Sequence, residues 1–283
     1  MTPTQRSAGD VPGQATEPLL TVDRIRLTFS GIVALDEVSL SIPTGAIFAI
    51  IGPNGAGKTS LFNCMSGVYR PDHGSIRFAG TELTTEPTHA VASLGLARTF
   101  QNIALFPQLT VLENMLVGRH HLFRAPWWSD AWMLPHTRHE EVKHRRRVEE
   151  VIDFLDLEAV RNRPTQILPY GVLKRVELGR ALSMDPTLLL LDEPAAGLNQ
   201  EETEDMAGYV LDIKQELGVT QLLIEHDLRF VLDLADRVAV LDFGRKIAEG
   251  DPPSIRQNPA VVEAYLGAGA GAGAEAGEQG RPS

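Results

Sequence analysis

One segment, GPNGAGKT at Gly52–Thr59, constrains this chain more than any other part of its sequence. It matches the pattern G-x-x-x-x-G-K-[ST], follows an apolar run at Ala46–Ile51 and precedes a predicted helix at Thr59–Gly67. Glycines at these positions allow a tight turn in which successive N–H groups point at phosphate oxygens, and the N-terminus of the following helix adds positive potential. The segment therefore predicts a phosphate-binding loop between a buried strand and a helix.

Two side chains of this loop have specific expected roles in binding ATP and Mg²⁺. Lys58 is expected to contact the β- and γ-phosphates of ATP, and the Thr59 hydroxyl is expected to bind Mg²⁺. The predicted nucleotide-binding residues of the loop are Gly52, Pro53, Asn54, Gly55, Ala56, Gly57, Lys58, Thr59 and Ser60.

Two acidic residues end a second apolar run, Leu188–Leu191. Open α/β sheets bind ligands at the carboxyl ends of their strands, so Asp192 is placed to hold Mg²⁺. Glu193 can accept a proton from the water that attacks the γ-phosphate. Alone, such a pair could equally cap a helix; downstream of a complete phosphate loop, the catalytic interpretation is favoured.

Composition narrows the class of protein. The formal net charge of −11 over 283 residues argues against nucleic-acid binding. No stretch approaches the roughly 18 apolar residues that span a bilayer, and Met1–Pro18 lacks the apolar core of a signal peptide. We therefore expect a cytosolic chain. Cys64, the single cysteine, is read as a buried small residue in preference to a reactive thiol.

The order of apolar runs predicts an α/β fold. Expected strands alternate with expected helices, which indicates a mostly parallel sheet covered on both faces. The expected strands are Leu19–Phe29, Val38–Ile42, Ala46–Ile51, Ser75–Phe78, Leu188–Leu191, Gln221–Ile224 and Val238–Leu241, and the expected later helices are Arg138–Leu157, Glu201–Leu217 and Asp227–Leu234. We predict a flexible arm at 1–17, one domain at 18–267 with a helical insertion at about 98–186, and a disordered low-complexity tail at 268–283.

Further motifs occur in the order found in ATP-binding cassette (ABC) ATPases, and the chain from Leu19 to Leu266 resembles that family. The fold implied is a P-loop NTPase core of ABC type, with a mixed sheet, flanking helices, an N-terminal antiparallel β part and the helical subdomain. Gln101 resembles the family's Q-loop glutamine, which contacts Mg²⁺ and water. Gly197–Asn199 resembles the D-loop, and His226 resembles the switch histidine that contacts the γ-phosphate. Phe29 stands where the family stacks an aromatic ring on adenine.

The segment Leu168-Pro169-Tyr170-Gly171-Val172 resembles the ABC signature, whose usual form is Leu-Ser-Gly-Gly-Gln. By resemblance, Tyr170 and Gly171 contact ATP bound to the opposite subunit of a dimer. Proline at 169 supplies neither a hydroxyl nor an N–H group, so this chain should contribute a weaker contact than usual. That favours a hetero-pair with a related ATPase subunit over a homodimer. No consequence is assigned to Asn199, where many relatives have aspartate.

Finer details resemble the ATPases of branched-chain amino-acid importers. They are Arg98–Asn102, the Tyr-Gly form of the signature, Glu193–Asn199 and the ending from Glu249–Pro252 to Tyr265–Leu266. The resemblance implies a peripheral subunit at the cytoplasmic face of the cell membrane, beneath two membrane-spanning permeases that receive solute from a binding protein. Urea, amides or aromatic acids are alternative solutes. A soluble ABC ATPase of translation or DNA repair, and a P-loop kinase or GTPase, are less favoured alternatives.

The segment Arg119–Arg147 is less informative. Trp127, Trp128 and Trp132 suit either a membrane or partner contact or packing beneath a local loop. The run His144–Arg147 is expected on a solvated helix face, with contact to lipid phosphates as the alternative.

Overall fold

The computed structural model describes residues 17–101, 103–122 and 135–265. The strands are β1 (Leu20–Phe29), β2 (Ile32–Ile42), β3 (Ile47–Ile51), β4 (His73–Phe78), β5 (Thr81–Glu82), β6 (Leu96–Arg98), β7 (Leu188–Asp192), β8 (Thr220–Ile224), β9 (Arg237–Asp242) and β10 (Arg245–Gly250). The helices are α1 (Lys58–Met65), α2 (Thr88–Ser93), α3 (Val111–Gly118), α5 (Pro135–Phe154), α6 (Tyr170–Leu182), α7 (Gln200–Leu217), α8 (Leu228–Leu234) and α9 (Pro252–Gln257), with short 3₁₀ turns η1 (His120–Leu122), η2 (Glu158–Val160) and η3 (Thr165–Ile167).

The larger sheet sets the position of the site. Its strands lie in the order β10-β9-β3-β8-β7-β6, and all neighbours pair in parallel except β10 with β9. Every residue of β3, β7 and β8 is buried, as expected for strands covered on both faces. Because these parallel strands end at one edge of the sheet, the loops that follow them meet there.

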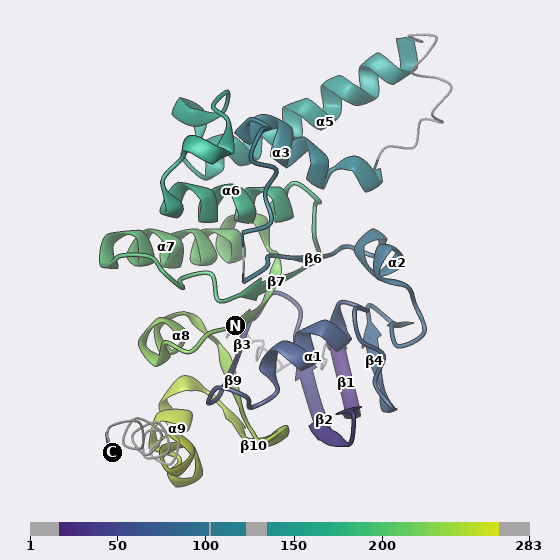
Figure 1. Cartoon of the computed structure of the whole chain (residues 1–283), viewed down its shortest axis with the longest axis vertical. Helices are drawn as coiled ribbons and strands as arrows, with labels where there is room; N and C mark the ends of the chain where they lie inside the picture. Colours follow the sequence, from purple (N-terminus) through teal and green to yellow (C-terminus); the bar gives the residue numbers. More distant parts are fainter. Residues whose placement is uncertain (1–16, 102, 123–134, 266–283) are drawn as a thin grey trace, which may run out of the picture.

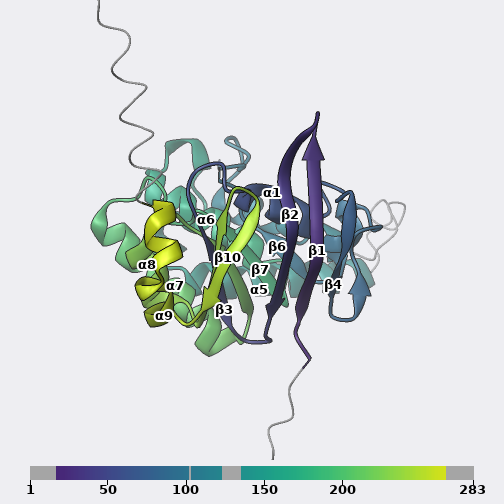
Figure 2. The ribbon, with the colours of Figure 1, turned by 90° about the horizontal axis from the view of Figure 1, so that it is seen from below.

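The smaller sheet is antiparallel and has the order β2-β1-β4-β5. Strand β1 pairs with β2 along its length, from Leu20 opposite Ile42 to Phe29 opposite Ile32. On its other side β1 pairs with β4. The two sheets meet where β2 runs beside β10 (Figure 2), and there Asp36 N donates a 2.8 Å hydrogen bond to Gly244 O. This contact brings the β2 segment next to the phosphate loop.

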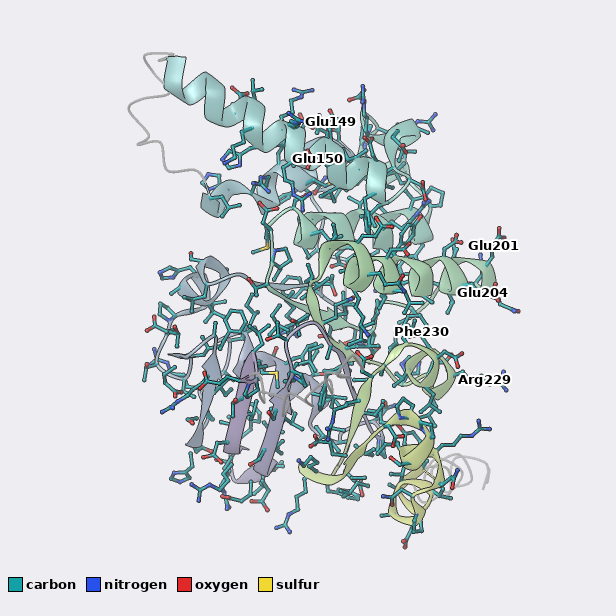
Figure 3. All side chains as sticks on the ribbon, turned by 180° about the vertical axis from the view of Figure 1, so that it is seen from behind. Glu149, Glu150, Glu201, Glu204, Arg229 and Phe230 are labelled. Atoms are coloured by element: carbon teal, nitrogen blue, oxygen red, sulfur yellow. The ribbon has the colours of Figure 1, made fainter. Side chains whose placement is uncertain are left out.

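Helices α3, α5 and α6 gather at one end of the molecule, between β6 and β7 in the chain (Figure 1). The helices approach one another closely at Gly179 of α6. A Cβ there would lie 2.3 Å from Met115 Cε and 3.0 Å from Leu155 Cδ1, so a side chain at this position would require the flexible end of Met115 to move. Glu149 and Glu150 lie on α5 (Figure 3). Glu149 forms an ion pair with Arg161, and Glu150 forms one with Arg147.

The expected strands and helices are confirmed, although β2 begins six residues earlier than expected, at Ile32. Three strands were missed: the two-residue β5, and β6 and β10. β6 is only three residues long, and β10 reads RKIAEG, which lacks the apolar alternation expected of a strand. The structure adds β6 to the start of the block interpreted as purely helical.

The expectation for His144 is wrong. The side chain of His144 is buried, and its Nδ1 accepts a 2.9 Å hydrogen bond from Arg119 Nε. Helical periodicity explains the difference, since His144 lies on the same face of α5 as the buried residues Val148 and Val151. Arg145 and Arg146 remain on the exposed face.

Among the described residues, no helix has both the length and the apolar character needed to cross a bilayer. The predicted arm at 1–17 and tail at 268–283 lie outside the described residues, apart from Glu17. Trp127, Trp128 and Trp132 lie outside them as well.

Candidate functional site

The phosphate loop joins β3 to α1, and its glycines are required by the backbone. Gly57 precedes α1 with φ 98°, and a Cβ there would lie 2.6 Å from Ala34 O. Gly52 has φ 152°, and a Cβ there would lie 2.1 Å from Leu241 O. Any other residue at either position would therefore collide with the backbone of a neighbouring strand.

Lys58 is the first residue of α1, and its side chain folds back over the loop. Its Nζ donates hydrogen bonds to Gly52 O at 2.7 Å and to Pro53 O at 2.9 Å. Burial lowers the pKa of the Lys58 ammonium, while the carboxylates of Glu193 and Asp192 act in the opposite direction. The loop thus holds the buried Lys58 side chain through two of its own carbonyl groups.

A pocket of about 280 Å³ opens over this loop. Most of the predicted nucleotide-binding residues line it, together with Gln101, which follows β6, and Glu193, which follows β7. The lining residues are Ala34, Asn54, Gly55, Ala56, Gly57, Lys58, Thr59, Ser60, Gln101 and Glu193. The structure therefore brings together a phosphate loop, a carboxylate and an amide that lie far apart in the sequence.

Glu193 occupies a strained position directly after β7. Its φ of 50° is unfavourable for a residue with a side chain, and such backbone strain concentrates at functional sites. Its carboxylate Oε2 accepts a 3.0 Å hydrogen bond from Gln101 Nε2. His226 follows β8, and its Nδ1 lies 3.9 Å from Glu193 Oε2 and 3.6 Å from Glu225 Oε2. Two of the predicted catalytic side chains, Gln101 and His226, thus lie close to the carboxylate of a third, Glu193.

Asp192 lies beneath this carboxylate at the end of β7. Its Oδ2 accepts a 2.7 Å hydrogen bond from Arg98 Nη2, and its Oδ1 is buried without a hydrogen-bond partner among the described residues. An unengaged carboxylate oxygen is unusual in a protein interior and is a suitable ligand for a hard cation. Thr59 and Gln101 line the pocket, and a hydroxyl, a side-chain amide oxygen and a carboxylate oxygen are all ligands that Mg²⁺ accepts.

The remaining predicted residues lie apart from this pocket. Phe29 ends β1, and its ring packs edge-to-face on Tyr69, with centroids 5.1 Å apart. Tyr170 opens α6, and its hydroxyl donates to Ala196 O at 3.3 Å. Gly171 packs against Glu202, where a Cβ would lie 2.2 Å from Oε1. None of these three is among the described residues that line the pocket.

Two contributors to the site, Ala34 and Lys174, carry no motif signal. Ala34 reaches the pocket only because β2 lies beside the loop. Lys174 Nζ donates to Glu193 O at 3.3 Å and lies 5.9 Å from the centroid of the Tyr170 ring.

Asn199, in the segment that resembles the D-loop, caps the N-terminus of α7. It forms a reciprocal capping box with Glu202, which gives the residue a structural role. A neutral asparagine and a charged aspartate can both accept that capping bond.

The fold and this site define a P-loop ATPase, and comparison with known proteins narrows the class. A model of the ABC transporter family matches residues 35–196, and a model of the branched-chain amino acid ATP-binding cassette transporter family matches residues 245–271. The high-affinity branched-chain amino acid transport ATP-binding protein BraF of Pseudomonas aeruginosa is 38% identical over 252 residues. LivG of Escherichia coli, which carries the same description, is 37% identical over 252 residues. Each match covers 89% of this chain and 99% of the relative.

Solved structures of ABC transporter cassettes resemble this chain as well. An ATP-binding cassette of an ABC transporter in its ADP conformation is 34% identical, with a TM-score of 0.78 over 89% of this chain and 100% of that one. A nucleotide-free cassette from an ABC transporter is 33% identical, with a TM-score of 0.76 over 88% of this chain and 98% of that one. The chain belongs to the family of ABC transporter ATP-binding proteins. Its predicted fold class is confirmed, and so is its assignment as an ATP-binding protein that hydrolyses ATP.

Proposed function

We propose that this chain energises the uptake of branched-chain or related amino acids as the ATPase subunit of an ABC importer. The observation that carries the ATPase assignment is the single pocket lined by Lys58, Gln101 and Glu193. The solute class is supported by the family match over residues 245–271 and by the printed descriptions of the relatives. Residues 18–267 would form one ABC ATPase domain, with α3, α5 and α6 as the helical subdomain at about 98–186.

In this proposal each side chain acts on ATP through a distinct contact. The loop N–H groups and the Lys58 ammonium bind the β- and γ-phosphates, and Ser60 lines the same pocket. Thr59, Gln101 and Asp192 would hold Mg²⁺, which when bound neutralises charge on the transferred phosphoryl group. Glu193 accepts the proton of the attacking water, while Gln101 and His226 orient the Glu193 carboxylate and the γ-phosphate. Phe29 would stack on adenine, with Tyr69 supporting its ring.

The partner ATPase is proposed to be a related but different subunit. Tyr170 and Gly171 lie away from this chain's own pocket, in keeping with a contact to nucleotide on the opposite subunit. Pro169 occupies the position before α6, where serine would offer a hydroxyl to the first N–H groups of the helix. The substitution Pro169→Ser should raise turnover of the reconstituted pair, mainly at the partner's ATP site. Unchanged turnover would count against unequal sites.

The remaining partners are two membrane-spanning permeases, which place this chain peripherally at the cytoplasmic face of the membrane. A reconstitution tests the whole proposal. The chain, its partner ATPase and the permeases in proteoliposomes should hydrolyse ATP faster when a binding protein loaded with leucine is supplied. Stimulation by urea or an aromatic acid but not by leucine would select the alternative solutes. Failure of the chain to associate with any multi-spanning protein in membranes would favour a soluble ABC ATPase instead.

A further inference from the structure

Arg98, the last residue of β6, contacts two other parts of the ATP site, the end of β7 and the C-terminal end of α1. Its Nη2 donates a 2.7 Å hydrogen bond to Asp192 Oδ2, at the end of β7. Its Nη1 donates to Asn63 Oδ1 at 2.7 Å and to Ser66 Oγ at 3.0 Å, both at the C-terminal end of α1. One guanidinium therefore ties the helix of the phosphate loop to the acidic strand end.

The environment of Arg98 favours arginine over any other cation. Its side chain is 9% exposed, and that of Asp192 is 2% exposed. The guanidinium carbon lies 5.7 Å from the centroid of the Phe62 ring and 5.5 Å from that of Phe100. A planar guanidinium can stack on aromatic rings while its two terminal nitrogens donate in different directions, which the point charge of lysine cannot reproduce.

The contact decides which oxygen of Asp192 remains for a ligand. Arg98 engages Oδ2, and the Thr99 hydroxyl accepts a 3.2 Å hydrogen bond from the Asp192 backbone N–H. Oδ1 stays buried without a hydrogen-bond partner among the described residues. The carboxylate is thereby fixed in orientation with one oxygen unengaged.

The same anchor fixes the start of the Gln101 loop. Beyond Arg98, the Phe100 N–H donates to Glu177 Oε1 at 3.2 Å, and Gln101 Nε2 then reaches Glu193 Oε2. Arg98 thus restrains both Asp192 and the backbone that leads to Gln101. These two residues are assigned to the Mg²⁺ site in the proposed function, on which this inference rests.

We propose that Arg98 is a positioning residue for the divalent cation: it holds Oδ2 of Asp192, presents Oδ1 to the metal, and anchors the loop that carries Gln101. Residues that orient metal ligands typically change metal affinity by about 10- to 100-fold when they are removed. A purely structural ion pair would instead affect folding without a specific effect on the metal.

The test measures how strongly a divalent cation and a nucleotide favour each other's binding. A non-hydrolysable ATP analogue is titrated into the full chain in Mn²⁺ and again in EDTA. The dissociation constant in EDTA is divided by the dissociation constant in Mn²⁺, and this ratio is compared among variants. Arg98→Met should lower this ratio about 10- to 100-fold, while the dissociation constant in EDTA stays within about twofold. Arg98→Lys keeps the charge and should recover part of the ratio.

Two further variants make the result specific. Arg119→Met removes another buried arginine, 4% exposed and 2.9 Å from Asp185, and should leave the ratio unchanged. The double substitution Asn63→Ala with Ser66→Ala retains the Asp192 contact but removes the α1 anchors, and should lower the ratio about 2- to 10-fold. This variant decides the matter if Arg98→Met does not fold.

The variant Asp192→Asn distinguishes the proposed role of Arg98 from the assignment of Asp192 to the metal site. If it lowers the ratio while Arg98→Met, or the double variant in its place, does not, the role of Arg98 is overturned and the metal assignment stands. If Asp192→Asn also leaves the ratio unchanged, the metal assignment is wrong and the inference falls with it.

Discussion

The Gln101 side-chain amide donates from Nε2 to Oε2 of Glu193 across 3.0 Å, although the two residues are 92 positions apart in the chain. Gln101 follows the edge strand β6, and Glu193 follows its neighbour β7, so the parallel pairing of these strands brings both residues to one edge of the sheet. The contact links the carboxylate that we assign as the base to the loop that starts the helical region. A change in the position of the Gln101 loop would therefore alter the orientation of the base.

Gln101→Ala should lower ATP turnover about 10- to 100-fold, because a hydrogen bond to a charged group contributes about 1.5–3 kcal/mol. ATP affinity measured without divalent cation should stay close to that of the unmodified protein. Gln200→Ala is the matched control, since Gln200 Nε2 donates to Glu204 Oε1 at the same 3.0 Å on the exposed surface of α7. Equal turnover of the two variants would show that the Gln101 contact has no catalytic role.

Gly57→Ala should lower ATP affinity by at least about tenfold, because the new Cβ would lie 2.6 Å from Ala34 O and would shift the loop. Gly80→Ala introduces a side chain at a similar φ of +80°, with no described atom within 4 Å of the Cβ. It should cost about 1–2 kcal/mol of stability and leave ATP affinity unchanged. Titration with a fluorescent ATP analogue compares them, and equal affinities would contradict this account of the loop.

Asn199→Ala should reduce the free energy of unfolding by about 1 kcal/mol, because it removes the side-chain acceptor from the capping box of α7. Asn199→Asp keeps an acceptor and adds a negative charge at the helix N-terminus, so its stability should match or slightly exceed the original. Urea denaturation measures both. Equal losses in the two variants would mean that the capping bond contributes nothing.

Cys64 should resist thiol reagents in the folded protein. Burial, assisted by the charge of Asp72, raises the pKa of its thiol to about 12, so it stays protonated at pH 8. Compared with a free cysteine of pKa about 8.5, the thiolate fraction falls about a thousandfold. A colorimetric disulfide reagent should react slowly with folded protein and rapidly in urea, with Cys64→Ala as the blank. Rapid reaction before unfolding would contradict the burial of this residue.

The sequence was sufficient to predict the elements with strong local signals. Ala46–Ile51 and Leu188–Leu191 are apolar on both faces and end in recognisable loops, so the strands and the edge at which they meet could both be expected. The short β6 and the polar β10 could not be, because their pairing depends on neighbours supplied by the fold.

The site was predictable to the same extent. The phosphate loop, Asp192 and Glu193 belong to motifs with a chemical reason for their residue types, whereas Gln101 was assigned by its resemblance to the glutamine of ABC ATPases. Arg98 stood in a quoted motif, but its four contacts with distant side chains follow from tertiary packing alone. The burial of His144 likewise followed from the face of α5 on which it lies, which the charged sequence around it obscured.

Glu193→Gln tests the central claim most directly, because the amide keeps the shape of the side chain but cannot accept the proton of the attacking water. The measurement is ATP turnover alongside ATP affinity, with the unmodified protein and Gln200→Ala measured in parallel. The account predicts that turnover falls about 100- to 10,000-fold while ATP remains bound, and that with the partner ATPase present an ATP-dependent pair forms on size-exclusion chromatography. Turnover within about twofold of the unmodified protein would contradict the assignment of Glu193 as the base.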